Sequence, residues 1–277
     1  MQKGRTLDKF LALATPRRRS WGLPGLSKIA ALGCVSRSRG KVAITATCYY
    51  CQVNIPALKA FGGLLFLLVA MSAVLFIPAW TLDYWQAWAF LAVFFSSALA
   101  ITAYLVKKDP TLLERRLQAG PTAEKETSQK IIQSITSLGF IAMLVIAALD
   151  HRFVWSTMSF YLELAGEVLV VVGFLIVFLV YRENTFASAT IELVPEQKVI
   201  STGLYALVRH PMYLGALFLL VGMSLSLGSW WGLFAFLLIM PALIWRIIDE
   251  EKFLARNLLG YVEYQEKVRC RLIPLVW

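Results

Sequence analysis

Charged residues are scarce in this chain, and acidic residues are the scarcest: 16% of the 277 residues are charged, with 17 Asp and Glu against 27 Lys and Arg. A soluble domain has about 25% charged and about 45–50% apolar residues. Here 58% are apolar, which excludes an ordinary soluble globular protein and equally a disordered or collagen-like chain. The apolar excess predicts membrane-spanning segments.

Histidine and cysteine are rare too, with two and four residues. Cys48 and Cys51 have C-x-x-C spacing, but a redox site needs that spacing beside a βαβ pattern, which the sequence lacks. A zinc site needs two further ligands, and the remaining Cys and His residues are widely scattered. We therefore expect no metal.

The formal net charge of +10 belongs almost entirely to the first 53 residues, which hold ten Lys and Arg and a single acid, Asp8. The remainder is nearly balanced, so we expect no nucleic-acid partner. Residues 1–53 fit a cleavable transit-like segment, a basic arm on an anionic membrane, or a disordered and dispensable extension. We favour the extension.

Long uncharged stretches follow, the last of which has 35 residues with Gly228 and Ser229 near its middle. At 1.5 Å per residue it is too long for one span and fits a tight hairpin of two short ones. We therefore predict an all-α, polytopic membrane bundle of about six transmembrane helices, or five if one is re-entrant or interfacial. The stretches are Phe61–Ala79, Tyr84–Val106, Ile131–Leu149, Val168–Tyr181 with an extension back to Phe160, and Pro211–Trp245.

The connections between these stretches differ in charge. Lys and Arg gather in residues 107–130, in 182–209 and in the tail after 245, whereas the alternate connections are nearly bare. The positive-inside rule then predicts an integral membrane protein with both termini cytoplasmic. Within 109–130, Pro110 and the leucines that follow it predict an amphipathic surface helix; a lid is the functional alternative.

Polar residues concentrate in 182–271, which we predict to be the catalytic region: a polar loop, the helical hairpin and a C-terminal amphipathic helix. Residues 54–181 would supply the first four spans and the amphipathic connection. Because a hairpin returns the chain to the side it left, Arg209–Pro211 should lie beside Arg246, Glu250 and Glu251 at one membrane face. Taken alone, these charges also fit surface ion pairs at the ends of spans.

The string G-L-Y-A-L-V-R-H-P-M-Y-L-G, from Gly203 to Gly215, resembles the signature of the isoprenylcysteine carboxyl methyltransferase family. The pattern E-E-x-x-L-x-x-x-L-x-G-Y-x-x-Y from Glu250 and the string V-R-C-R-L-I-P from Val268 resemble its C-terminal part. The ordered set covers residues 184–277. Residues 57–180 match only as spans, and residues 1–53 do not match.

The resemblance, which extends to phospholipid methyltransferases, implies a membrane enzyme that transfers a methyl group from S-adenosylmethionine. The acceptor would be a carboxylate on a lipophilic, isoprenylcysteine-like small molecule or prenylated partner within the membrane lipid. The family's substrate-side arginine falls near Arg246, although Ile247 occupies the matching column. Arg246 and Glu250 are the implied catalytic residues. A cofactor pocket at the cytoplasmic face would be lined by Gln197, Lys198, Val199, Ile200, Tyr205, His210, Pro211, Met212, Tyr213 and Glu251.

The chemistry of the residues agrees with this reading. Methyl transfer to an anionic nucleophile needs positioning and exclusion of water more than acid–base help. The guanidinium of Arg246 suits bidentate binding of a carboxylate.

Other functions stay open. Methylation of a lipid amine is the nearest, and a sterol-type reductase shares a similar R-H-x-x-Y-x-G string but lacks a second nicotinamide-binding signature here. A transporter or a scaffold is the alternative from a class other than enzymes. Transport predicts polar residues at the midplane of the membrane, and the polar residues here gather at one face.

Overall fold

The computed structural model describes residues 36–38, 41–43, 49–124, 126–191, 193, 196–274 and 276–277. The chain divides into two compact units, Met1–Gln52 and Val53–Trp277. In the first unit, β1 (Ser36–Ser38) and β2 (Lys41–Ala43) form an antiparallel pair. Most of the expected N-terminal extension, including Cys48, lies outside the described residues.

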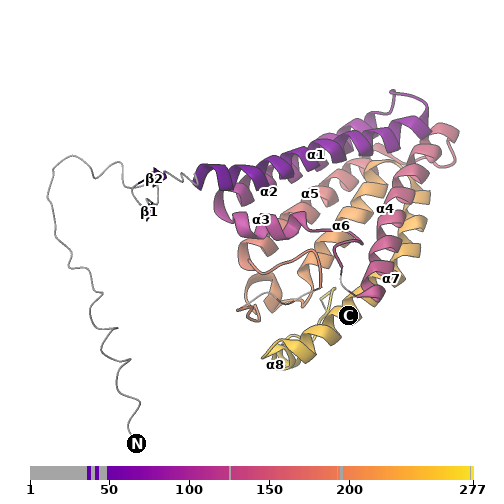
Figure 1. Ribbon diagram of the computed structural model, residues 1–277. Helices are drawn as coiled ribbons and strands as arrows, with labels where there is room; N and C mark the ends of the chain where they lie inside the picture. Colours follow the sequence, from indigo (N-terminus) through magenta and orange to yellow (C-terminus); the bar gives the residue numbers. More distant parts are fainter. Residues whose placement is uncertain are drawn as a thin grey trace, which may run out of the picture. The chain divides into compact units, whose positions relative to one another are not determined.

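The rest of the described chain is helical, as predicted (Figure 1). Five helices, α1, α2, α4, α5 and α7, are long and apolar enough to cross a membrane. The helices are α1 (Tyr49–Ala79), α2 (Trp85–Lys108), α3 (Pro110–Leu117), α4 (Thr127–Phe153), α5 (Phe160–Glu183), the 3₁₀ turn η1 (Gly203–Ala206), α6 (Pro211–Ser226), α7 (Trp230–Asn257) and α8 (Tyr261–Lys267). The first helix therefore begins inside the region assigned to the extension.

The predicted hairpin is present as α6 and α7, and α6 is the short member with 16 residues, about 24 Å long. Just beyond its C-terminal end, the hydroxyl of Ser229, the N-cap of α7, donates over 2.6 Å to the carboxylate of Asp150 near the end of α4. The backbone N–H of His210, just before α6, bonds the Arg271 carbonyl of the tail. Helix α6 thus runs from one end of the bundle to the other, beside the five longer helices.

Glycine allows α5 and α6 to pack closely. Gly166 and Gly173 on α5 lie seven residues apart, as do Gly215 and Gly222 on α6. A methyl group added at Gly166 would come within 2.3 Å of the Ser226 backbone nitrogen, and one at Gly222 within 2.8 Å of the Gly166 carbonyl oxygen. Inside a membrane, small residues of this kind let helix backbones approach and gain dispersion energy. The close contact holds α6 along α5, with the end of α6 against the start of α5.

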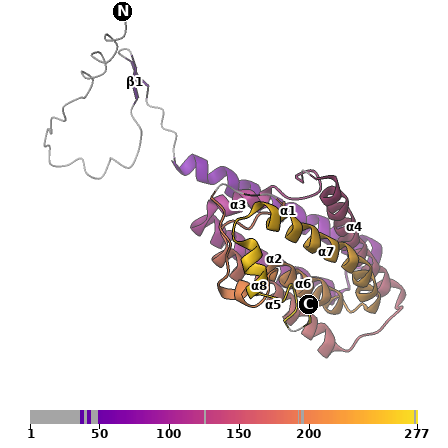
Figure 2. The same ribbon diagram turned by 90° about the horizontal axis from the view of Figure 1, so that it is seen from below.

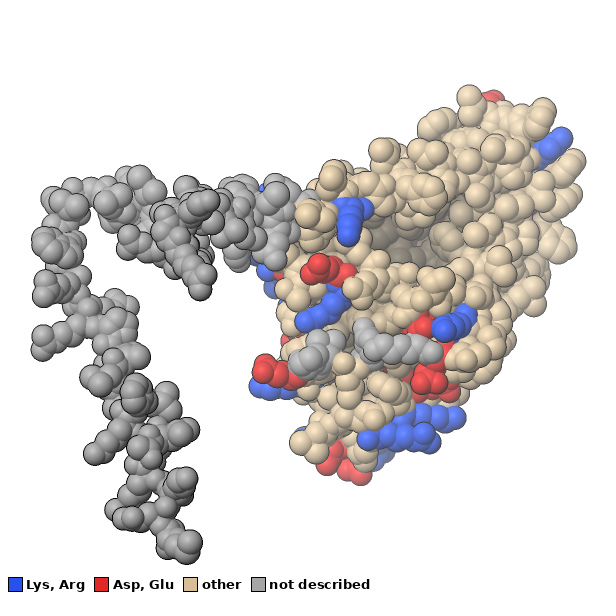
Figure 3. All heavy atoms as spheres, in the orientation of Figure 1, with Lys and Arg blue, Asp and Glu red and all other residues tan. Residues whose placement is uncertain are grey.

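The apolar core fills the middle of the bundle. It joins Leu75 of α1, Phe90 of α2, Leu144 of α4 and Phe236 of α7, all buried. Figures 1 and 2 show α4 beside α7 and α5 beside α6, the two helix pairs with the largest contacts. Charged side chains gather toward the end that carries α3 and α8, and the visible flanks of the long helices are mostly uncharged (Figure 3). Chemistry that needs polar groups is therefore confined to that end.

The amphipathic helix predicted after Asp109 is confirmed as α3. The Asp109 side chain accepts from the Leu112 backbone N–H over 2.9 Å, which caps the helix, and Pro110 fills its first turn. Leu112 and Leu113 are buried, in the same cluster as Tyr181 of α5. The helix thus lies on the polar end of the bundle with its leucines inward.

The orientation of this bundle in the membrane is a prediction from its charges. We expect the end that carries α3 and α8 to face the cytoplasm, because the basic connections all lie there. Topology reporters fused at Ala119, Met158 and Trp277 should read inside, outside and inside. An outside signal at Ala119 would overturn the orientation.

Candidate functional site

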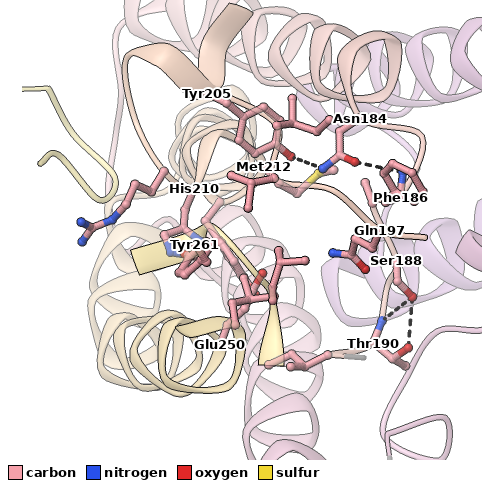
Figure 4. A pocket seen from close by; sticks show the side chains of 18 of the residues that line it. Asn184, Phe186, Ser188, Thr190, Gln197, Tyr205, His210, Met212, Glu250 and Tyr261 are labelled. Carbon is pink, nitrogen blue, oxygen red and sulfur yellow. Dashed lines mark hydrogen bonds between the residues drawn. The ribbon is translucent and has the colours of Figure 1, made fainter. Parts of the chain in front are cut away.

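Ten of the twelve candidate residues line one cavity, which has a volume of about 240 Å³ (Figure 4). It lies where α5 ends, α6 begins and the polar part of α7 passes. The ten are Gln197, Lys198, Val199, Ile200, Tyr205, His210, Met212, Tyr213, Arg246 and Glu250. The other two, Pro211 and Glu251, are not among the lining residues. Pro211 occupies the first turn of α6, as expected from its missing N–H.

Further residues line the cavity that the sequence reasoning did not select. Tyr261 and Tyr264 belong to the recognised C-terminal pattern, and Arg209 directly precedes His210, so a signal existed for these three. Arg116 of α3 and Gln133 of α4 lie outside every recognised string. Only tertiary contact brings them to the site.

The loop after α5 forms one wall. The Asn184 side-chain oxygen Oδ1 accepts from the Phe186 backbone N–H, and its side-chain nitrogen Nδ2 donates to the Tyr205 hydroxyl, both over 2.9 Å (Figure 4). From the opposite side, Arg115 and Arg116 of α3 donate to the Thr185 and Ser188 carbonyls, each over 2.8 Å. The loop is thus tied to α3 and η1 at once, which holds the wall in place.

Tyr205 is a neutral donor and acceptor at physiological pH. Burial raises the pKa of its phenol to about 12, and this outweighs the opposing effect of its hydrogen bond with Asn184. Its backbone carbonyl accepts from the Tyr264 hydroxyl over 2.7 Å. Tyr205 therefore joins η1 to α8 and offers the cavity a polar group without charge.

Arg246 is the centre of a buried network. Its guanidinium forms a 2.7 Å ion pair with Glu124, from the connection between α3 and α4, and the two side chains are 8% and 2% exposed. It also donates to the Gln129 side chain over 2.9 Å, to the Tyr213 hydroxyl over 3.0 Å and to the Ala189 carbonyl over 3.1 Å. One side chain of α7 thereby joins α4, α6 and two loops around the cavity.

The network continues through α6 to a second side chain of α7. The Tyr213 hydroxyl accepts from Arg246 and donates to the Glu250 carboxylate over 2.7 Å. Arg246 and Glu250 lie four residues apart and both line the cavity, so they share a helix face as predicted. Glu250 is the one acidic side chain among the described lining residues.

Glu251 lies behind the cavity in a separate ion cluster. Its carboxylate is 2.8 Å from Arg209 Nε, 2.9 Å from Arg271 Nε and 3.3 Å from His210 Nε2. The Arg209 contact is a charge contact only, because Nε is misaligned for a hydrogen bond. The predicted meeting of Arg209 and His210 with α7 is therefore present, and Glu251 holds the His210 ring that lines the cavity.

The tail completes this cluster. The backbone N–H groups of Arg209 and His210 bond the carbonyls of Cys270 and Arg271. The Arg209 guanidinium also donates to the Gln265 and Val268 carbonyls. The tail, α7 and the start of α6 are thus fastened at one point.

A second cavity, of about 460 Å³, lies within the apolar part of the bundle. It is lined mainly by apolar side chains of α1, α4, α6 and α7, such as Met71, Phe140, Leu220 and Leu243. Gln133 lines both cavities, so they adjoin at this residue. Among the described residues, no group of three His, Cys, Asp or Glu side chains is placed to hold a metal.

Comparison with known families matches residues 162–259 to the model described as phospholipid methyltransferase. The match begins in α5 and ends after α7, so it includes the polar loop, the hairpin and the α7 members of both ion networks, Arg246 and Glu251. No curated protein matches the chain. The matched segment supplies most of the cavity wall.

Proposed function

We propose that this chain, whose residues 162–259 match the phospholipid methyltransferase model, is an integral membrane methyltransferase that uses S-adenosylmethionine to methylate a lipophilic acceptor. The observation that carries the proposal is a polar cavity, lined mostly by the matched segment, that shares the lining residue Gln133 with an apolar cavity among the long helices. One cavity suits a water-soluble methyl donor, and the other suits the apolar part of a lipid.

The first cavity contains the groups that S-adenosylmethionine requires. Met212, Tyr205 and Tyr261 offer apolar and aromatic surface for an adenine ring, and Ser188 and Glu250 offer polar partners for hydroxyl or amino groups. When bound, the cofactor supplies a methyl group on a positively charged sulfur. The residues of the chain would orient both reactants, and the bonds from Arg115 and Arg116 keep the loop that forms one wall in place.

The charges around the first cavity favour an anionic acceptor, and we propose a carboxylate of isoprenylcysteine type. Arg116, Lys198, Arg209 and Arg246 line the cavity; Glu251 and Glu124 pair with the last two, which leaves Arg116 and Lys198 against the single lining acid Glu250. A lining with an excess of one sign raises the local concentration of ligands of the other sign. A carboxylate is already ionised at neutral pH and needs no general base. The apolar chain of the acceptor would lie in the second cavity.

A lipid amine is the second candidate, because the family description itself names phospholipid methylation. The geometry adds an argument: Arg246 is already neutralised by Glu124, and Glu250 presents a carboxylate that suits an ammonium group. Phospholipid head groups also carry a phosphate, which the basic lining would accommodate.

Labelled cofactor separates the two candidates. Membranes that contain the full chain are incubated with methyl-labelled S-adenosylmethionine, and the extracted lipid is treated with base. We expect label that base releases, because a methyl ester hydrolyses and a methylated amine does not. Label that resists base would assign the lipid amine, and no transfer above that of membranes lacking the protein would overturn both.

A further inference from the structure

Gln133 occupies a place in the bundle that no other described side chain shares. It comes from α4, it is half-buried, and it lines both the polar and the apolar cavity. Within the described part of the chain, no hydrogen bond involves its side-chain amide. The amide is also not one of the fully buried polar groups that lack a partner, so it stays accessible from the cavities. It is therefore free to bond a polar group of a ligand that enters them.

The neighbouring turn of α4 shows the contrast. Gln129 is buried as well, but its oxygen accepts from Arg246 and its nitrogen donates to Asp249, each over 2.9 Å. Gln129 is thus fully employed in holding α4 to α7. Gln133 lies four residues further, on the same face of α4, where both cavities are lined by it.

The lining of the two cavities indicates which kind of ligand would contact Gln133. On one side lie the basic groups and Glu250 of the polar cavity, and on the other lie apolar side chains such as Phe140 and Leu243. An amphiphile with its chain in the apolar cavity has its polar head at the junction, beside Gln133. A primary amide is uncharged and has two N–H donors, which suits hydrogen bonding to an anionic oxygen.

We propose that Gln133 is a specificity-determining residue that donates a hydrogen bond to the anionic head of the acceptor where the two cavities meet. This inference rests on the proposed function, since it needs an acceptor in the apolar cavity. The amide fixes the depth at which the head group stops and so places it beside the cofactor cavity.

Direct binding tests this without requiring turnover. Radiolabelled S-farnesylcysteine, with its free carboxylate, is bound to the detergent-purified full chain in the presence of S-adenosylhomocysteine. We expect Gln133→Leu to weaken saturable binding about ten- to hundredfold, the effect of losing one hydrogen bond to a charged group. Gln133→Glu should weaken it further, because a carboxylate would then face a carboxylate. Gln133→Asn, whose shorter amide falls short of the head group, should also bind more weakly.

The control is Ser134→Ala, the adjacent position, whose hydroxyl bonds the Lys130 carbonyl of its own helix and lines neither cavity. Gln133 also lines the cofactor cavity, so the readout is the difference between the two ligands: the Gln133 variants should lose far more affinity for the probe than for S-adenosylhomocysteine, whereas a general structural defect would weaken both together. Equal probe affinity in wild type and Gln133→Leu would overturn the inference, as would absent saturable binding by the wild type or tighter binding by Gln133→Glu. Failure of the proposed function would show separately, as wild-type protein that neither binds S-adenosylmethionine nor transfers its methyl group.

Discussion

Substituting Arg246 with alanine should destabilise the protein severely and abolish methyl transfer. The change leaves Glu124, only 2% exposed at its side chain, without its cation, and frees Gln129, Tyr213 and the Ala189 carbonyl together. Breaking a buried ion pair by removing one partner costs about 3–5 kcal/mol. Thermal unfolding in detergent measures the loss. Arg256→Ala is the matched control, because Arg256 is exposed on the same helix and should leave the melting temperature unchanged.

A double variant separates scaffolding from catalysis. In Glu124→Gln/Arg246→Met no buried charge is left unpaired, so part of the lost stability should return. If Arg246 also holds the acceptor carboxylate, the refolded double variant should bind S-adenosylmethionine yet remain inactive. Substantial activity in the double variant would show that Arg246 only organises the cavity. An Arg246→Ala protein that melts with wild type would contradict the network itself.

Glu251→Gln is expected to lower the melting temperature strongly as well, for a related reason. The carboxylate faces Arg209, His210 and Arg271, and its side chain is 7% exposed. Without its charge the buried Arg209 guanidinium loses compensation, at a cost of about 3–5 kcal/mol. The attachment of the tail to α7 weakens at the same time, because Arg271 loses its partner. Cofactor affinity should change little, because Glu251 acts on the cavity only by holding the His210 ring in place.

The adjacent Glu250 provides the contrast. Glu250 lines the cavity, and its partner Tyr213 finds an acceptor oxygen in glutamine too. We therefore expect Glu250→Gln to reduce activity at a nearly unchanged melting temperature. Sequence reasoning had placed Glu251 directly on the cofactor. That assignment predicts a ten- to hundredfold loss of cofactor affinity in Glu251→Gln with normal melting, the outcome that would contradict the positioning role given to it here.

Periodicity and composition alone predicted most of the helices. A charge-free stretch long enough to span a membrane must be helical, because every backbone polar group there has to bond within the segment. The Gly228–Ser229 pair marked the turn between two helices, and Pro110 after Asp109 marked the start of another. The start of α1 was missed because residues 49–60 carry no long apolar run. The full length of α7 was missed because Arg246, Glu250 and Glu251 look like the end of a span, although their side chains have partners inside the protein.

The sequence by itself determined that this is a helical membrane protein whose polar chemistry gathers at one end, and that Arg209, His210 and the α7 acids meet there. Short strings of fixed spacing and hydrophobic segments carry that information locally. Only the tertiary structure decided what each polar group does. Glu250 faces the cavity and Glu251 turns behind it, because successive helix residues point about 100° apart and no string records which one faces inward. The pairing of Arg246 with Glu124, and the place of Gln133 between two cavities, join segments more than 100 residues apart, and only packing brings such segments together.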